Sequence, residues 1–272
     1  MSRSGKVFVR EDDASELTGP CYLLKMRSWL IKTIRSLKGR PTISAPTRFV
    51  VLFPGRTGSS HLVSCLSQHH EIFVEGEKLV RLDLAAQREY LRGLYGDEPR
   101  NHVRAVGFKT KLKDIASLEE FASTLIAHDV RIITLLRENR VKLAVSTLNA
   151  RRIHALHGRW NLVGGEPQLP PLDATVDEIV SMIERVESSQ RDVMTFASRL
   201  PLPRLEITYE TMLASHDATM KQVQEFLQVD PRPLVGSVAK ATHDDLRRSV
   251  VHFEALAERL RDTEYDSEVS GR

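Results

Sequence analysis

The sequence predicts an α/β protein whose central parallel β-sheet is flanked by helices on both faces. Apolar runs of strand length, rich in β-branched and aromatic residues, lie at 48–53, 103–112 and 130–136. The first and third runs pass directly into segments whose apolar residues have helical spacing. Strands that alternate with helices in this way lie parallel in one sheet, so we expect a three-layer fold.

Length and composition fit a single sizeable domain. The chain has 272 residues, of which 41% are hydrophobic, and this is enough to bury a large core. We interpret residues 1–46 as an N-terminal extension and residues 47–272 as the domain. The net charge is +3, but Lys and Arg are spread along the chain, so no nucleic-acid partner is indicated.

Two features bear on the compartment in which the protein works. Cys21 and Cys65 are its two cysteines, which is too few for a disulfide framework and favours a reducing environment. No apolar run approaches the roughly 20 residues of a transmembrane helix, and the first residues have no secretory signal pattern. We therefore expect a cytoplasmic protein.

A basic amphipathic helix is predicted at 22–38, within the extension. Leu23, Met26, Leu30 and Ile34 recur at helical spacing, with Lys and Arg on the other faces. Such a helix packs on its own domain, packs on a second subunit in a homodimer, or makes peripheral contact with an anionic membrane. The sequence leaves these partners open.

The turn after the first strand has the composition of an anion-binding, P-loop-like segment. Unpaired N–H groups and the macrodipole at a helix N-terminus favour negative charge. A glycine permits close backbone approach, and hydroxyl groups and a guanidinium add donors. Hydroxyl residues also cap helices that bind nothing, but three of them beside an arginine favour an anion. The candidate ligands are Arg56, Thr57, Gly58, Ser59, Ser60 and His61.

A second anion motif follows the strand at 130–136. This strand ends in Arg137, and Ser146 lies on the helix that follows. A nucleotide triphosphatase would need the pattern G-x-x-x-x-G-K-[ST] and an acidic strand end to hold magnesium. The first loop has no Gly-Lys pair and the second strand ends in a cation, so both motifs favour a metal-independent anion site.

In these motifs the chain resembles sulfotransferases that use 3′-phosphoadenosine-5′-phosphosulfate. Residues 54–60, Pro-Gly-Arg-Thr-Gly-Ser-Ser, are similar to the 5′-phosphosulfate loop of the bacterial and Golgi carbohydrate-type branch, where Arg replaces the Lys of cytosolic enzymes. Arg137 and Ser146 resemble the pair that grips the donor's 3′-phosphate. The resemblance covers roughly residues 48–260 and implies this donor, its product 3′-phosphoadenosine-5′-phosphate, and no metal.

The resemblance also implies residues of a late loop. Lys240 and Thr242 match the segment that lies over the adenosine 3′-phosphate. A plain helix start capped by Asp244 explains this stretch equally well. The Tyr-Glu pair at 209–210 is similar to a family element whose role is mostly structural, and residues after about Thr263 are expected to form a frayed polar tail.

Three residues are assigned to the chemistry. Gly-Phe-Lys at 107–109 resembles the strand whose Lys faces the transferred sulfonyl group, which assigns that role to Lys109. Cytosolic members have a His base where this chain has Lys111, and a Lys of normal pKa is a poor base at neutral pH. Members of the Golgi and bacterial type often have Gly-Glu, as at 76–77 here, and some use a Glu in this region as general base, so the resemblance implies that role for Glu77, with Glu75 as the alternative. Without the resemblance, this stretch would be interpreted as a solvated acidic turn. Arg56 is expected to stabilise charge on the bridging oxygen of the donor.

The acceptor is expected to bind under a long loop at 151–173, which Gly and Pro residues punctuate. Trp160 is a candidate stacking platform, and the resemblance to carbohydrate-type enzymes favours a sugar or glycolipid hydroxyl. His154 and His157 have helical spacing, but they lack a third ligand, so no metal site is predicted. The alternatives are a P-loop kinase-like phosphotransferase that uses magnesium and ATP, and a non-catalytic protein that binds anions or a membrane surface.

Overall fold

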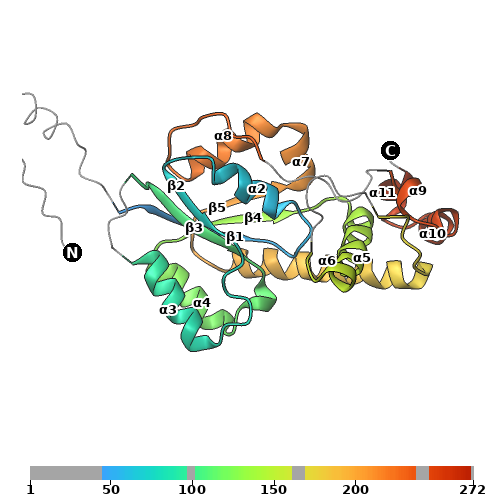
Figure 1. The fold of residues 1–272 in the computed structure, drawn as a ribbon, viewed down its shortest axis with the longest axis horizontal. Coiled ribbons are helices and arrows are strands. Elements are labelled where there is room, and N and C mark those ends of the chain that lie inside the picture. The colour runs from blue at the N-terminus through green and yellow to red at the C-terminus, as the bar shows by residue number, and fades with distance from the viewer. Residues whose placement is uncertain (1–44, 97–101, 161–168, 237–244, 271–272) are drawn as a thin grey trace, which may run out of the picture. The chain divides into compact units, whose positions relative to one another are not determined.

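Parallel strands form the centre of the structure, a computed structural model that describes residues 45–96, 102–160, 169–236 and 245–270. Within these residues five strands have the spatial order β2-β3-β1-β4-β5, so the first strand is the middle one (Figure 1). Every pairing between neighbours is parallel, which confirms the predicted α/β class. The strands are β1 (Thr47–Leu52), β2 (Ile72–Glu75), β3 (Ala105–Thr110), β4 (Arg131–Leu136) and β5 (Arg204–Thr208).

Helices cover both faces of the sheet, because successive side chains of β1 point to opposite faces. Phe49 and Val51 lie in a core shared with α2, α7 and α8. Val50 and Leu52 lie in a second core under α3, α4 and α6 (Figure 1). These helices are α2 (Ser59–Leu66), α3 (Leu84–Tyr95), α4 (Leu118–Ala127), α6 (Val176–Ser198), α7 (Tyr209–Ala214) and α8 (His216–Phe226).

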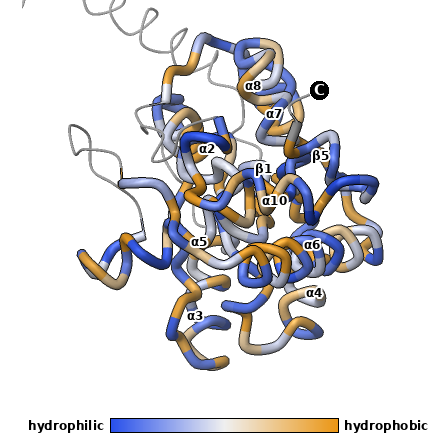
Figure 2. The backbone as a smooth tube through the Cα atoms, turned by 90° about the vertical axis from the view of Figure 1, so that its right-hand side faces the viewer, coloured by the Kyte–Doolittle hydropathy of each residue, from blue (hydrophilic) through white to orange (hydrophobic). Residues whose placement is uncertain are grey.

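A third core joins α6 to the helix after β4. Val145, Ile183 and Leu256 belong to it, on α5 (Arg140–His157), α6 and α10 (Phe253–Leu260) respectively. Hydrophobic and hydrophilic residues alternate along α6, as expected for a helix with one buried face (Figure 2). The remaining short helices are η2 (Leu112–Asp114), α9 (Leu246–Ser249) and α11 (Asp266–Ser270).

The charged, amphipathic stretch at about 79–95 predicts a helix from Leu79, but α3 begins later, at Leu84. The Asp83 carboxylate accepts a hydrogen bond from the Ala86 backbone N–H at 2.8 Å and caps the helix there. Leu79 is fully buried in the second core, and its segment forms a turn rather than a helix. Leu79 is therefore buried without being helical, whereas Val80 and Leu82 of the same segment are exposed.

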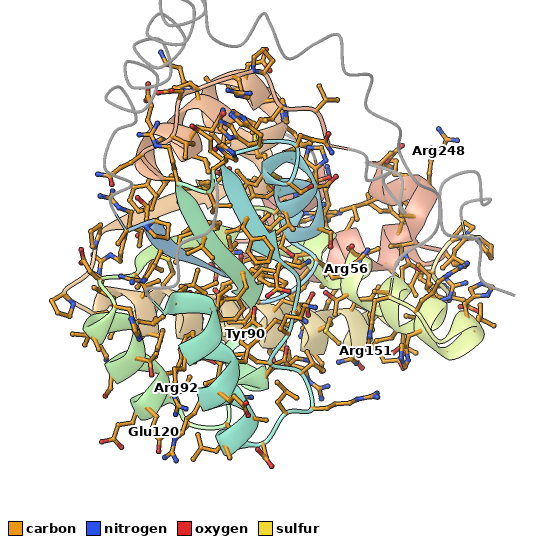
Figure 3. All side chains as sticks on the ribbon, turned by 60° about the vertical axis from the view of Figure 1, so that its left-hand side comes forward. Arg56, Tyr90, Arg92, Glu120, Arg151 and Arg248 are labelled. Atoms are coloured by element: carbon orange, nitrogen blue, oxygen red, sulfur yellow. The ribbon has the colours of Figure 1, made fainter. Side chains whose placement is uncertain are left out.

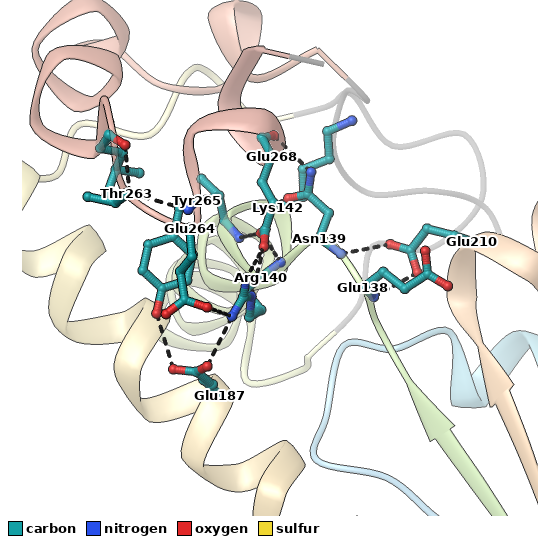
Figure 4. A network of polar contacts seen from close by, with 12 residues as sticks. Glu138, Asn139, Arg140, Lys142, Glu187, Glu210, Thr263, Glu264, Tyr265 and Glu268 are labelled. Atoms are coloured by element: carbon teal, nitrogen blue, oxygen red, sulfur yellow. Dashed lines mark hydrogen bonds and ion pairs between the residues drawn. The ribbon is translucent and has the colours of Figure 1, made fainter. Parts of the chain in front are cut away.

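The frayed tail predicted after Thr263 is wrong for the described residues. Glu268 of α11 accepts hydrogen bonds from the backbone N–H groups of Arg140 (2.5 Å) and Val141 (3.1 Å) at the start of α5. The Arg140 guanidinium also pairs with Glu187 and Glu264 at 3.0 and 2.7 Å (Figure 4). A carboxylate at a helix N-terminus is stabilised by the unpaired amides. Val269 and Tyr265 also belong to or pack on the third core, so this tail is held both by charge and by apolar contacts.

The helix predicted at 22–38 lies outside the described residues, so its contact with a membrane or a second subunit stays a prediction. The boundary expected at 46/47 stays a prediction as well. In the described part of the chain, no helix combines the length and the hydropathy needed to span a bilayer.

The close packing of β3 against β1 yields a stability prediction at Gly107. A Cβ there would lie 2.3 Å from the Phe49 carbonyl oxygen and 2.6 Å from Phe49 Cγ. We expect Gly107→Ala to lower the free energy of unfolding by about 1–3 kcal/mol or more, because the sheet must shift to admit the methyl group. Urea unfolding followed by circular dichroism measures the change.

Gly93 provides the matched control. It lies on the exposed side of α3, and a Cβ there meets no atom within 4 Å. Gly93→Ala is expected to raise the free energy of unfolding by about 0.5–1 kcal/mol, since glycine disfavours a helix interior. Equal stability of Gly107→Ala and wild type would contradict the packing described here.

Candidate functional site

The carboxyl ends of three strands bring the predicted site residues to one edge of the sheet. Leu52 of β1 lies in register with Thr110 of β3 and with Thr134 of β4. The segments after these residues therefore emerge side by side, and they carry Arg56 and Arg137. Open α/β sheets bind ligands in the crevice outside their carboxyl edge, so this edge is the candidate site.

The loop between β1 and α2 turns through three left-handed residues. Gly55, Arg56 and Gly58 have φ values of 123°, 58° and 82°. Gly58 is the N-cap of α2, and a Cβ there would lie 2.8 Å from Tyr209 Cδ2, so both its backbone angle and its space require glycine. A positive φ at an arginine costs free energy and is typical of residues that a functional site holds in place.

Thr57 is the innermost residue of this loop. Its side chain is fully buried, and its hydroxyl has no hydrogen-bond partner among the described residues. An unsatisfied buried hydroxyl costs about 1–3 kcal/mol. The loop therefore holds a polar group whose partner is still to be supplied.

Lys109 reaches the N-terminus of α2 from the end of β3. Its ammonium donates hydrogen bonds to Ser60 Oγ at 2.9 Å and to Ser59 Oγ at 3.3 Å, and the residue is only 6% exposed. Burial lowers the pKa of Lys109, the Glu77 carboxylate opposes this, and the charges of Lys111 and Arg56 add to the lowering. The loop hydroxyls and this cation thus form one polar cluster.

Glu77 is the acidic member of the cluster. Its carboxylate pairs with the Lys111 ammonium through Oε2, and Oε1 lies 3.4 Å from Lys109 Nζ. Burial raises the pKa of Glu77, but the two lysines outweigh burial, so the pKa lies below the ordinary value of a glutamate. Lys111 therefore orients this carboxylate and favours its charged form.

Glu75 lies elsewhere. Its carboxylate accepts a hydrogen bond from the Tyr90 hydroxyl at 2.9 Å and pairs with Lys78 at 3.3 Å. Figure 3 shows Tyr90 on α3, apart from Arg56. Of the two predicted bases, only Glu77 makes contact with Lys109.

The two predicted anion motifs meet through their arginines. The Arg56 guanidinium donates hydrogen bonds to Ser146 Oγ at 3.4 Å and to the Trp160 carbonyl at 3.0 Å. Burial and the nearby charge of Arg137 lower the pKa of Arg56. Two neighbouring guanidinium groups create a field that attracts anions.

Tyr209 and Glu210 position the side chain of Arg137. The sequence indicated only a general structural role for these two residues. The Arg137 guanidinium lies over the Tyr209 ring, 4.6 Å from its centroid, and 3.8 Å from Glu210. Gln190 of α6 accepts the Arg137 backbone N–H at 2.8 Å. No signal in the sequence pointed to Gln190, since 53 residues separate it from Arg137.

Some predicted residues do not join this cluster. Lys240 and Thr242 lie outside the described residues. His61 contacts Cys65, with 3.7 Å between Nε2 and Sγ, and its ring centroid lies 5.6 Å from that of His216. The predicted role of His61 in binding an anion at the loop after β1 stays a prediction.

Comparisons with known proteins found similarity in structure. No family model and no curated protein matches the chain in sequence. The sulfotransferase domain from the curacin biosynthetic pathway is 17% identical, over 69% of this chain and 76% of that one, with a TM-score of 0.44. A sulfotransferase from Alicyclobacillus acidocaldarius is 16% identical, over 84% and 97%, with a TM-score of 0.45. Mouse sulfotransferase SULT7A1 complexed with PAP is 13% identical, over 83% and 87%, with a TM-score of 0.44.

The depressed pKa of Glu77 predicts how stability depends on pH. Its folded-state pKa lies below the unfolded value of about 4.3, so its ion pairs stabilise the fold fully above that value, and this stability is lost as pH falls through the folded pKa. The difference in free energy of unfolding between wild type and Glu77→Gln should stay constant above about pH 6 and shift against the wild type below about pH 4. Urea unfolding at several pH values measures it, and a difference that never changes would contradict the lowered pKa.

Proposed function

We propose that this protein is a sulfotransferase that moves a sulfonyl group from 3′-phosphoadenosine-5′-phosphosulfate to a hydroxyl acceptor. One observation carries the proposal: Arg56, Lys109 and Arg137 gather at one sheet edge, and Lys109 also holds the carboxylate of Glu77. Cations with loop hydroxyls suit a donor that carries anionic groups at two positions. A neighbouring carboxylate suits an acceptor that must lose a proton.

The residues present fit the donor. The left-handed loop and the first turn of α2 offer backbone amides to the 5′-phosphosulfate, and the buried Thr57 hydroxyl is a further polar group without a partner among the described residues. Arg137 and Ser146 are assigned to the 3′-phosphate. The 3.4 Å contact between Arg56 and Ser146 joins the two sets, so both ends of one donor would be held by a single continuous surface.

The residues of the site account for sulfonyl transfer without a metal. Glu77, ionised at neutral pH because its pKa is lowered, takes the proton of the acceptor hydroxyl as that oxygen bonds to sulfur. The bond from sulfur to the bridging oxygen breaks, and Arg56 with the loop amides stabilises the charge left on that oxygen. Lys109 stabilises the sulfonyl oxygens during transfer.

A carbohydrate or glycolipid hydroxyl is the proposed acceptor class. Trp160 stacks on His154 with 4.3 Å between ring centroids, and it is 53% exposed. Its backbone carbonyl accepts a hydrogen bond from Arg56, so residue 160 lies beside the loop after β1. An aromatic face with polar groups beside it suits a ligand that has both apolar and hydroxyl surface.

Binding of the product tests the donor site. Titration calorimetry with 3′-phosphoadenosine-5′-phosphate in the presence of a chelator is expected to show one site in the wild type. Arg137→Ala should weaken binding by about 10- to 100-fold, the value of a charge-assisted hydrogen bond. The control is Arg104→Ala, at the opposite end of β3, where Arg104 lies 3.8 Å from Glu71. Failure of a folded wild type to bind would refute the proposal.

Turnover tests the base. With radiolabelled donor and a panel of glycan acceptors, Glu77→Gln should lower kcat by about 100-fold or more, while affinity for the product changes little. Glu75→Gln is the matched control and should keep most of the activity, because Glu75 contacts Tyr90 and Lys78 instead. Loss of turnover in Glu75→Gln alone would move the base to that residue.

A further inference from the structure

A cluster of three metal-ligating side chains lies between α2 and α8. His61 and Cys65 are four residues apart on α2 and so share one face of the helix, and His216 is the first residue of α8. One ligand atom from each of the three lies within 4.8 Å of the others. Within the described residues, this is the one group of three or more His, Cys, Asp or Glu side chains that could hold a metal ion.

The separation of two of the three ligand atoms is close to that in a tetrahedral zinc site. Zinc binds imidazole nitrogen at about 2.0 Å and thiolate sulfur at about 2.3 Å, which places two ligand atoms roughly 3.5 Å apart. His61 Nε2 and Cys65 Sγ are 3.7 Å apart. A cation between them would require only small side-chain movements.

The surroundings of the cluster also match a metal centre. His216 Nε2 lies 2.8 Å from the carbonyl oxygen of Leu234, which can only accept, so Nε2 carries the proton and Nδ1 keeps its lone pair. A ligating histidine commonly has its second nitrogen fixed in this way. Gly236 brings backbone close over the cluster, since a Cβ there would lie 2.6 Å from His61 Nδ1 and 2.8 Å from Cys65 Sγ.

We propose that His61, Cys65 and His216 bind a zinc ion, with a fourth position left for water or a backbone oxygen. One thiolate and two imidazoles form a ligand set that suits Zn²⁺. The ion would join α2, which begins at the anion loop, to α8 across the core that both helices share. The proposed sulfonyl transfer needs no metal, and binding of zinc would remove His61 from the residues predicted to bind the donor.

Cobalt substitution tests the thiolate ligand. The full chain, stripped with a chelator, is titrated with Co²⁺, which reports a bound thiolate through near-ultraviolet charge-transfer absorption and a tetrahedral geometry through its visible bands. We expect saturation at one Co²⁺ per chain and displacement by Zn²⁺. Cys65→Ser should lose the charge-transfer band, whereas Cys21→Ser, the matched control at the other cysteine, should keep it.

The histidine ligand is tested by affinity for zinc, measured in competition with a chromophoric chelator. His216→Ala should bind Zn²⁺ at least about tenfold more weakly than wild type, whereas His70→Ala, which removes an exposed histidine, should bind equally. Circular dichroism establishes that each variant is folded. If Cys65→Ser does not fold, the zinc affinity of His216→Ala tests the proposal instead. No stoichiometric metal in folded wild type, or a charge-transfer band that survives Cys65→Ser, would overturn the proposal and leave a thiol hydrogen-bonded to His61.

Discussion

The packing of Tyr209 aligns the two loops that carry the predicted anion motifs, and the geometry of the candidate site depends on it. One edge of the ring fills the space that a side chain at residue 58 would need, and the face of the ring lies under the Arg137 guanidinium. Glu210, the next residue, accepts hydrogen bonds from the backbone N–H groups of Glu138 and Asn139 at 2.9 and 3.3 Å. The start of α7, directly after β5, thus fixes the backbone at Gly58 in the loop after β1 and the side chain of Arg137 in the loop after β4.

At this edge of the sheet, three basic side chains lie near one carboxylate. The charges of Lys111 and Arg56 both lower the pKa of Lys109, and the Glu77 carboxylate pairs with the two lysines. Buried like charges disfavour the unliganded state, and a bound anion relieves that cost. Because the groups are already held by hydrogen bonds, little reorganisation is needed when charge develops on a ligand.

Local signals in the sequence predicted much of this site. The strand, the turn at Gly58 and the start of α2 follow from β-branched runs, a glycine and hydroxyl residues that are neighbours in the chain. Parallel strands then place Arg137 beside Arg56, which explains why a fold class sufficed to bring them together. The pairing of Lys111 with Glu77 was missed, because nothing in a strand pattern states where the next loop folds back.

Long-range polar contacts explain the remaining differences. The segment after Thr263 has few apolar residues, and Val269 is its one member of the third core among the described residues. Glu268 and Tyr265 also hold it through polar contacts with α5 and α6, more than 70 residues away. Gln190 reaches Arg137 across 53 residues. Periodicity detects apolar faces, so a segment held by charge on a distant helix is invisible to it.

The cap that Glu268 provides at α5 also determines how the two ends of an anionic ligand can be recognised. The first amides of α5 are already bonded to a carboxylate of the chain itself, whereas no side chain caps the first turn of α2. An anion at α2 can therefore be read by main-chain dipoles, which tolerate changes in side-chain identity. An anion beside α5 must be bound by side chains alone. Substitutions there can therefore change the affinity for one end of the ligand while binding of the other end stays the same.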